Sequence, residues 1–256
     1  MSDLERTRDL AELYLRFGDD RLVLGHRLSE WCGHAPIVEE DIALANLALD
    51  CIGQASAWLE LAGELEGRGR SADQLAFFRG PPEFRNCLLV EQPNGDFACT
   101  VVRQVLFDAV GANVLEQLSR SRDARIAAIA ARALVEVRYH VRHGRDWWLR
   151  LGDGTEDSHL RMQHAVDELW PFGAELVASD EIDRSLAESA VGADLELARA
   201  ASERELAGLF ARTGLERPEP PPFPPSGGRQ GKHGEQLDHL LSEMQSVARA
   251  HPGAQW

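Results

Sequence analysis

The sequence predicts an all-α fold in which long amphipathic helices pack as a bundle. Apolar residues recur at helical spacing over most of the chain, whereas the alternation typical of half-buried strands is nearly absent. Hydrophobic residues make up 44% of the 256 residues, which is enough to bury a substantial core. We therefore expect a single domain spanning residues 1–256, with additional helices toward its C-terminal end.

Four helical segments are expected in the first half of the chain. Residues 4–31 keep helical periodicity until a Gly and a Pro signal a stop. Residues 39–65 begin with an acidic turn, which the helix dipole favours, and end before a Gly-rich stretch. A short helix over 73–78 and a Pro-Asn-Gly turn signal then lead into a third long helix over 97–118.

Four more helices and one extended segment are expected in the second half. A long helix over 124–152 has an Asp placed as its N-cap and a Gly-Asp-Gly stop. Further helices are expected over 156–178 and 185–213. The Pro- and Gly-rich residues 216–231 cannot be helical and are expected to form a strap or linker. A final amphipathic helix is expected over 232–250.

One face of the helix over 124–152 carries a row of polar residues. Glu136, Tyr139, His140 and His143 are spaced at i, i+3, i+4 and i+7, so they project from the same side. A ferritin-like di-iron bundle uses such rows: two helices carry Glu-x-x-His motifs, and two others each add one Glu. Here Tyr139 stands where the His of that motif is needed. The sequence therefore predicts a ferritin-like bundle with an incomplete metal-binding pattern.

The remaining ligands of a di-iron site have only partial counterparts. The nearest candidates on the other three long helices are Glu30, Asp50 and Asp108. The second imidazole is missing, because no histidine lies between His34 and His140. Asp is also one methylene shorter than Glu, which draws its oxygens back toward its own helix. This ligand set argues against a functional di-iron centre in the chain.

We interpret these groups as a degenerate site that has become a satisfied polar network, because buried charges survive only when paired. Arg103 and Arg138 are the expected partners. Glu156 and His159 also match the Glu-x-x-His motif, but they lie in the first turn of a helix, where solvent-exposed capping residues are expected. No catalytic, cofactor-binding or metal-binding residue is therefore predicted. The predicted polar core consists of Glu30, Asp50, Asp108, Glu136, Tyr139 and His140.

Charge and hydropathy restrict the partners and the compartment. A net charge of −15 argues against a nucleic-acid or anionic-membrane surface, since binding phosphates needs clustered Lys and Arg. Residues 1–15 are charged from the start and do not form a signal peptide. No uninterrupted apolar run is long enough to cross a bilayer. We expect a cytoplasmic protein that does not bind nucleic acid or membrane.

Six blocks of sequence resemble the structural C subunits of bacterial 1,2-phenylacetyl-CoA epoxidases, which are multicomponent monooxygenases of phenylacetate breakdown. None of these blocks is a generic fold motif, and together they extend from one end of the chain to the other. Residues 180–230 are the least characteristic part. The blocks are residues 22–36, 39–50, 83–98, 102–109, 136–163 and 233–245.

The resemblance implies a ferritin-like subunit that has lost its metal and pairs with a related catalytic subunit. That partner is expected to bind the di-iron centre and phenylacetyl-CoA, and a separate iron–sulfur flavin reductase to deliver electrons. The implied activity of the complex is NADPH- and O2-dependent epoxidation of the aromatic ring. The alternative is a metal-binding oxygenase subunit with a degenerate di-iron site, and the missing second histidine argues against it.

Overall fold

The predicted all-α class is confirmed by the computed structural model, which describes residues 3–254. Within this range there are eleven α-helices, three 3₁₀ helices and no strand. The chain forms two compact units. The first combines the chain up to Pro93 with the chain from Ser226, and the second runs from Asn94 to Pro225. The single domain expected over residues 1–256 stays a prediction.

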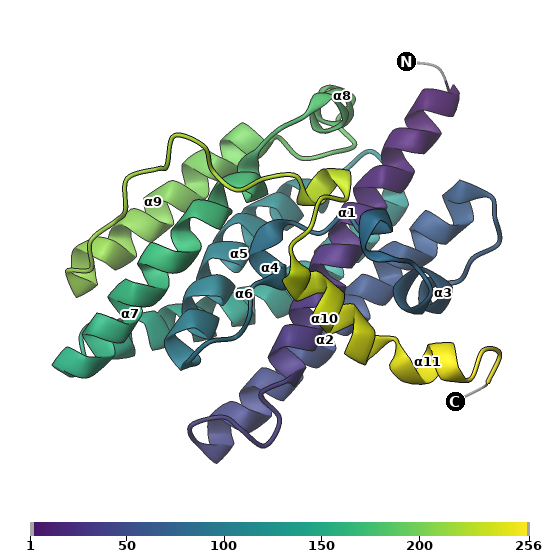
Figure 1. Ribbon diagram of the computed structural model, residues 1–256. Helices are drawn as coiled ribbons and strands as arrows, with labels where there is room; N and C mark the ends of the chain where they lie inside the picture. The colour runs from purple at the N-terminus through teal and green to yellow at the C-terminus, as the bar shows by residue number, and fades with distance from the viewer. Residues whose placement is uncertain (1–2, 255–256) are drawn as a thin grey trace. The chain divides into compact units, whose positions relative to one another are not determined.

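The first unit is built on a pair of long helices that pack side by side (Figure 1). These are α1 (Asp3–Ser29) and α2 (Val38–Glu66), joined by residues 30–37. A Cβ atom at Gly18 would lie 2.7 Å from the Leu59 side chain. Glycine at this position therefore allows close approach of the two helices.

Shorter elements complete the first unit, and some come from the C-terminal end of the chain. The helix expected over 232–250 begins at Glu235 and is divided at Gln245. The buried Gln245 side chain donates hydrogen bonds to two backbone carbonyls of the same unit. The elements are α3 (Ala72–Phe77), η1 (Pro81–Glu83), α4 (Leu88–Glu91), η3 (Gly228–Gln230), α10 (Glu235–Met244) and α11 (Ser246–Ala250).

The second unit is organised around α5 (Phe97–Leu118), which is buried along most of its length. It packs against α6 (Ala124–Gly152), α7 (Glu156–Leu169) and α9 (Leu195–Thr213). The bounds predicted for α5 and α6 are confirmed. They were predictable because Asp side chains cap the first turn of both helices by accepting hydrogen bonds from backbone N–H groups.

Two predicted helices of the second unit have different limits from those expected. The helix expected over 156–178 ends as an α-helix at Leu169 and continues as the 3₁₀ helix η2 (Trp170–Val177). Pro171 lacks the N–H group that would extend the α-helical pattern.

The helix expected over 185–213 is two helices, α8 (Glu181–Glu188) and α9. Ala190, with φ of 56°, adopts the left-handed conformation between them. Asp194 then starts α9 by accepting hydrogen bonds from two backbone N–H groups.

Two helices are long and apolar enough to meet a simple criterion for a membrane span. In α5, 83% of the relevant stretch is buried inside the protein, as in the core helix of a soluble protein; in α2 the share is 44%. Each helix also carries a charged residue near its middle, Asp50 in α2 and Asp108 in α5.

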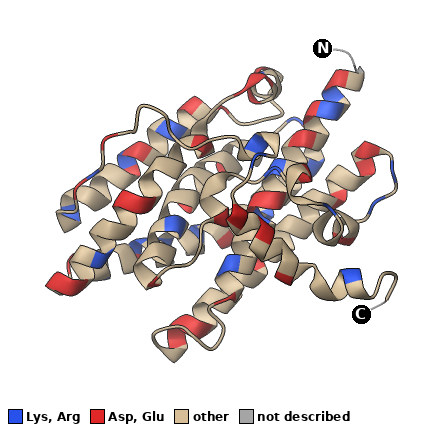
Figure 2. Cartoon of the chain, in the orientation of Figure 1, with Lys and Arg blue, Asp and Glu red and all other residues tan. Residues whose placement is uncertain are grey.

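The first helix, α1, is more highly charged. Charges of both signs alternate along its N-terminal half (Figure 2).

Candidate functional site

The polar row on α6 is only partly buried. His140 is 1% exposed, as expected for a core residue. The Glu136 side chain is 27% exposed, and its carboxylate lies 3.9 Å from Arg132 Nε. Tyr139 is 42% exposed, and its ring stacks on His143 with the ring centroids 6.2 Å apart. The prediction of a wholly buried row was therefore wrong for Tyr139, which lies on the solvent side.

Asp108 and Arg103 are buried on α5, as expected from the sequence. Gln104 Nε2 donates a hydrogen bond of 2.6 Å to Asp108 Oδ2. Arg103 Nη2 donates one of 2.5 Å to Asn94 Oδ1. Arg138, the other expected partner of the buried acids, is exposed, so its predicted place in the buried core beside them was wrong.

The other two predicted core acids belong to the first unit. Glu30 directly follows α1, is exposed, and accepts a hydrogen bond of 2.9 Å from Arg27. Its predicted place in a buried core was therefore wrong. Asp50 lies within α2 and is half-buried. Neither is followed by a histidine three positions later.

The donor set of α6 does not fit half of a di-iron site. Such a site takes its imidazole from the position three residues after the Glu, and here an exposed phenol occupies that position. Over residues 3–254, no group of three or more His, Cys, Asp or Glu side chains is arranged so that it could hold a metal ion. We therefore derive no chemistry through a metal in this chain.

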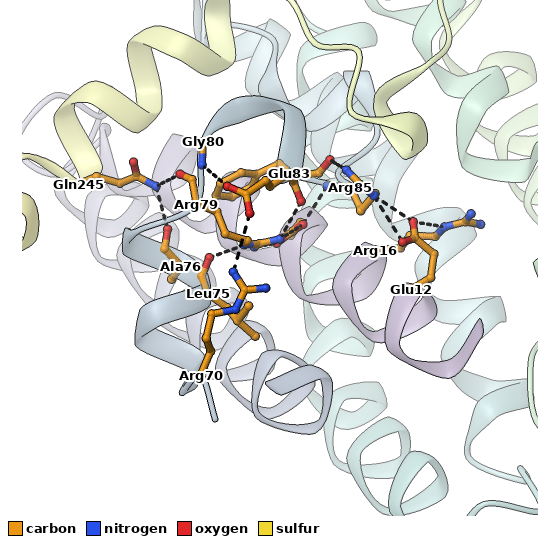
Figure 3. A network of polar contacts seen from close by, with 12 residues as sticks. Glu12, Arg16, Arg70, Leu75, Ala76, Arg79, Gly80, Glu83, Arg85 and Gln245 are labelled. Atoms are coloured by element: carbon orange, nitrogen blue, oxygen red, sulfur yellow. Dashed lines mark hydrogen bonds and ion pairs between the residues drawn. The ribbon is translucent and has the colours of Figure 1, made fainter. Parts of the chain in front are cut away.

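The densest group of buried charges lies in the first unit, and sequence reasoning missed it. Asp19, in α1, is fully buried and forms a two-point ion pair with Arg79. Arg79 Nε also donates to the Leu75 carbonyl, and its guanidinium lies 4.3 Å from the centroid of the Phe84 ring. Figure 3 shows Arg79 at the centre of this polar network. An arginine with this many partners is fixed in one position.

A second buried ion pair joins α1 to the C-terminal segment, by which we mean residues 226–254. Arg229 donates hydrogen bonds of 2.9 and 2.8 Å to the two oxygens of Asp20. Cys87 N donates to the same carboxylate over 2.7 Å. The adjacent acids Asp19 and Asp20, which lie among apolar residues of α1, were the sequence signal for both pairs.

A third charged contact attaches the C-terminal segment to α4. Glu91 is 1% exposed and accepts hydrogen bonds from Asn86 Nδ2, Gly234 N and His233 Nδ1. His233 Nε2 lies 3.1 Å from the Phe84 carbonyl oxygen. Because both ring nitrogens face acceptors, the ring satisfies both contacts only when it is doubly protonated.

The surroundings of His233 favour that charged form. Burial lowers the pKa of His233, but the hydrogen bonds to Glu91 and to the Phe84 carbonyl, with the charges of Glu91 and Asp19, outweigh burial. The pKa of His233 is therefore raised above its ordinary value. Together with the Arg229 pair, this contact fixes the position of the C-terminal segment.

The same segment is also held by contacts to α3 and the residues that follow it. Gln245 Nε2 donates to the carbonyls of Ala76 and Arg79 over 2.9 and 3.0 Å (Figure 3). Arg249 donates to the Arg79 carbonyl over 3.0 Å. The polar side chains described here form hydrogen bonds with backbone groups and ion pairs within the first unit. Their arrangement is structural, because every contact described joins one part of the fold to another.

Comparisons with known proteins agree with the resemblance in the sequence. The sequence model of the phenylacetic acid catabolic protein family matches residues 1–256. The chain is also 48% identical over 247 residues to the C subunit of 1,2-phenylacetyl-CoA epoxidase from Escherichia coli strain K12. The aligned region covers 96% of this chain and 99% of that relative. The predicted ferritin-like helical fold is in accord with this match.

Proposed function

The chain belongs to the phenylacetic acid catabolic protein family, and on that basis we propose that it is the structural subunit of a phenylacetyl-CoA ring epoxidase. The observation that carries the proposal is the 48% identity to the C subunit of such an epoxidase, which extends over nearly the full length of both chains. In this proposal the chain pairs with a separate catalytic subunit in the cytoplasm and stabilises it.

The proposal assigns the di-iron centre and the oxygen chemistry to the catalytic partner. It is supported by the donor set of α6, where the exposed Tyr139 stands in place of an imidazole. It is also supported by the use of buried charges in the first unit, where Asp19 and Arg79 hold the fold together. A protein with a structural role is expected to combine such internal contacts with a surface for its partner.

Apolar residues near the two ends of the chain are mostly packed inside the first unit, so they offer little surface to a partner. Within residues 4–14 and 237–247, the apolar side chains of Leu13, Tyr14 and Leu237 are buried in the first unit.

An apolar stripe on α2 fits a partner surface better. Val38, Ile42 and Leu49 are 73%, 59% and 66% exposed, and their spacing places them along one helical face. Exposed apolar side chains gathered on one surface often mark a site of contact with another protein. We propose that the α2 stripe, defined as these three residues, packs against the catalytic subunit.

Co-expression with the catalytic subunit tests both parts of the proposal. The two chains are expected to elute together in size exclusion at low micromolar concentration, and the complex to epoxidise phenylacetyl-CoA when the reductase and NADPH are supplied. Ile42→Asp should weaken the complex by at least about tenfold, because a charge would be buried at the interface. Leu197→Asp, at a similarly exposed leucine of α9, serves as the matched control. Separate elution of two folded chains would overturn the assignment.

A further inference from the structure

The second unit contains a cavity of about 590 Å³ that the proposed function does not use. Its walls come from α5, η2 and α9, and residues of the Pro-rich strap also line it. A volume between about 300 and 1,000 Å³ is typical of sites that bind small molecules. The size of the cavity is therefore suited to a compact organic ligand.

The inner wall of the cavity is apolar. Leu106 and Val110 of α5 face it together with Leu176 of η2 and Leu206 of α9. All four are buried. Trp170 adds an indole ring, which packs edge-on against Phe210 with the ring centroids 5.4 Å apart. Such a wall favours the hydrocarbon or aromatic part of a ligand, because it offers contact area with few hydrogen-bonding groups.

Charged side chains of α9 and the strap lie among the lining residues. Two of them are arginines, and they differ in how closely other side chains bind them. Arg199 donates two hydrogen bonds, of 2.6 and 3.1 Å, to Glu196. Arg217 is held more loosely: its guanidinium carbon lies 4.9 Å from the Trp170 ring centroid, and Nη2 is 3.9 Å from Glu203. The 3.9 Å separation is too long for a hydrogen bond. The Arg217 side chain is 46% exposed, so its guanidinium is accessible to a ligand.

An arginine that lies over an indole ring is oriented for recognising a planar anion. The stacking restricts the guanidinium plane, while its N–H groups stay available for the two oxygens of a carboxylate. A lysine would provide charge without this two-point geometry. Arg217 therefore adds a specific polar contact beside the apolar wall of the cavity.

We propose that this cavity binds a small amphipathic carboxylate, with its apolar part against Leu106, Val110 and Trp170 and its carboxylate on Arg217. The strap residues Pro220 and Pro224 cover the bound molecule. Proline fixes the backbone of the strap in an extended form, so that little conformational entropy is lost when the strap closes on a ligand.

Titration calorimetry of the full chain with octanoate and with 1-octanol tests this proposal. These probes share an eight-carbon chain and differ in the headgroup. Octanoate is expected to bind one molecule per chain, and at least about tenfold more tightly than 1-octanol, because only the carboxylate can accept two charge-assisted hydrogen bonds. Arg217→Gln should remove that difference, whereas Arg212→Gln, at an exposed arginine of α9 outside the cavity lining, should keep it.

A second variant tests the location. Ala174 lines the cavity and is exposed, so Ala174→Trp should fill the space without disturbing the core and should abolish binding of both probes. Ala207→Trp, at an exposed alanine of α9 that does not line the cavity, is the matched control. No binding of octanoate by the folded wild-type chain at millimolar concentration, or binding unchanged in Ala174→Trp, would overturn the proposal.

Discussion

The two units of the protein use polar residues on amphipathic helices in opposite ways. In the first unit, Asp19 and Asp20 of α1 are buried and each holds an arginine from a distant part of the chain. In the second unit, Glu136 and Tyr139 of α6 share a helical face but are still open to solvent. A polar row on a helix therefore does not reveal by itself whether the row is structural, functional or merely solvated. Burial and the partners of each charge decide the question.

The largest expected effect concerns the Asp19–Arg79 pair. Asp19→Ala should lower the free energy of unfolding by about 3–5 kcal/mol, because it leaves the Arg79 charge buried without its main partner. Urea unfolding followed by circular dichroism measures the loss.

The double variant Asp19→Ala with Arg79→Met is the control for this interpretation. It removes both charges, so it should be more stable than Asp19→Ala alone. A loss below about 1 kcal/mol for the single variant would show that the pair contributes little, as exposed pairs do, and would remove the contrast between the units.

The next effect is a pH dependence that arises from His233. Because its folded pKa is raised, its stabilising contribution is fully present below the ordinary value of 6.5 and is lost as pH rises through the raised pKa. The loss should be about 1.5–3 kcal/mol, as for a hydrogen bond to a charged group. Unfolding measured across this pH range should show the decline in the wild type.

Two histidine variants separate this contribution from other titrating groups. His233→Gln should flatten the decline, whereas His164→Gln should keep it, because the His164 side chain is 80% exposed. An equal pH dependence in His233→Gln and the wild type would refute the assignment of the decline to His233.

The smallest effect is expected at the position where the di-iron pattern fails. Tyr139→Ala should change the free energy of unfolding by less than about 1 kcal/mol, because Tyr139 is 42% exposed and removes little apolar area from water. The same urea titration measures it. A cost of 3 kcal/mol or more would place Tyr139 among the residues that support the core, as its spacing along α6 first suggested.

Local signals in the sequence were sufficient for most of the helices. Asp96 and Asp123 cap α5 and α6, and helical periodicity continues to the observed ends. The break before α9 was missed, although Asp194 is also a capping residue, because the apolar spacing continues across the gap. The change from α7 to a 3₁₀ helix was also missed, although Pro171 marks it in the sequence.

The polar network could not be predicted from periodicity, because its partners are distant in sequence. Asp20 and Arg229 are 209 positions apart, and Glu91 and His233 are 142 positions apart. Periodicity places a residue on one face of its own helix, but it does not show which face another segment covers. Periodicity placed His140 and Tyr139 on the same side of α6, but only His140 is covered by other parts of the fold. The burial of His140 was therefore predicted correctly, whereas that of Tyr139 was not.

Iron analysis of the purified chain tests the central claim most directly, namely that this protein has a structural role and leaves metal chemistry to its partner. After aerobic iron loading and removal of excess metal, elemental analysis of the chain alone should find no stoichiometric iron. The complex with the catalytic subunit should contain about two irons for each catalytic chain. Two irons bound by this chain alone, and lost in Glu136→Ala, would contradict the account and establish α6 as part of a metal site.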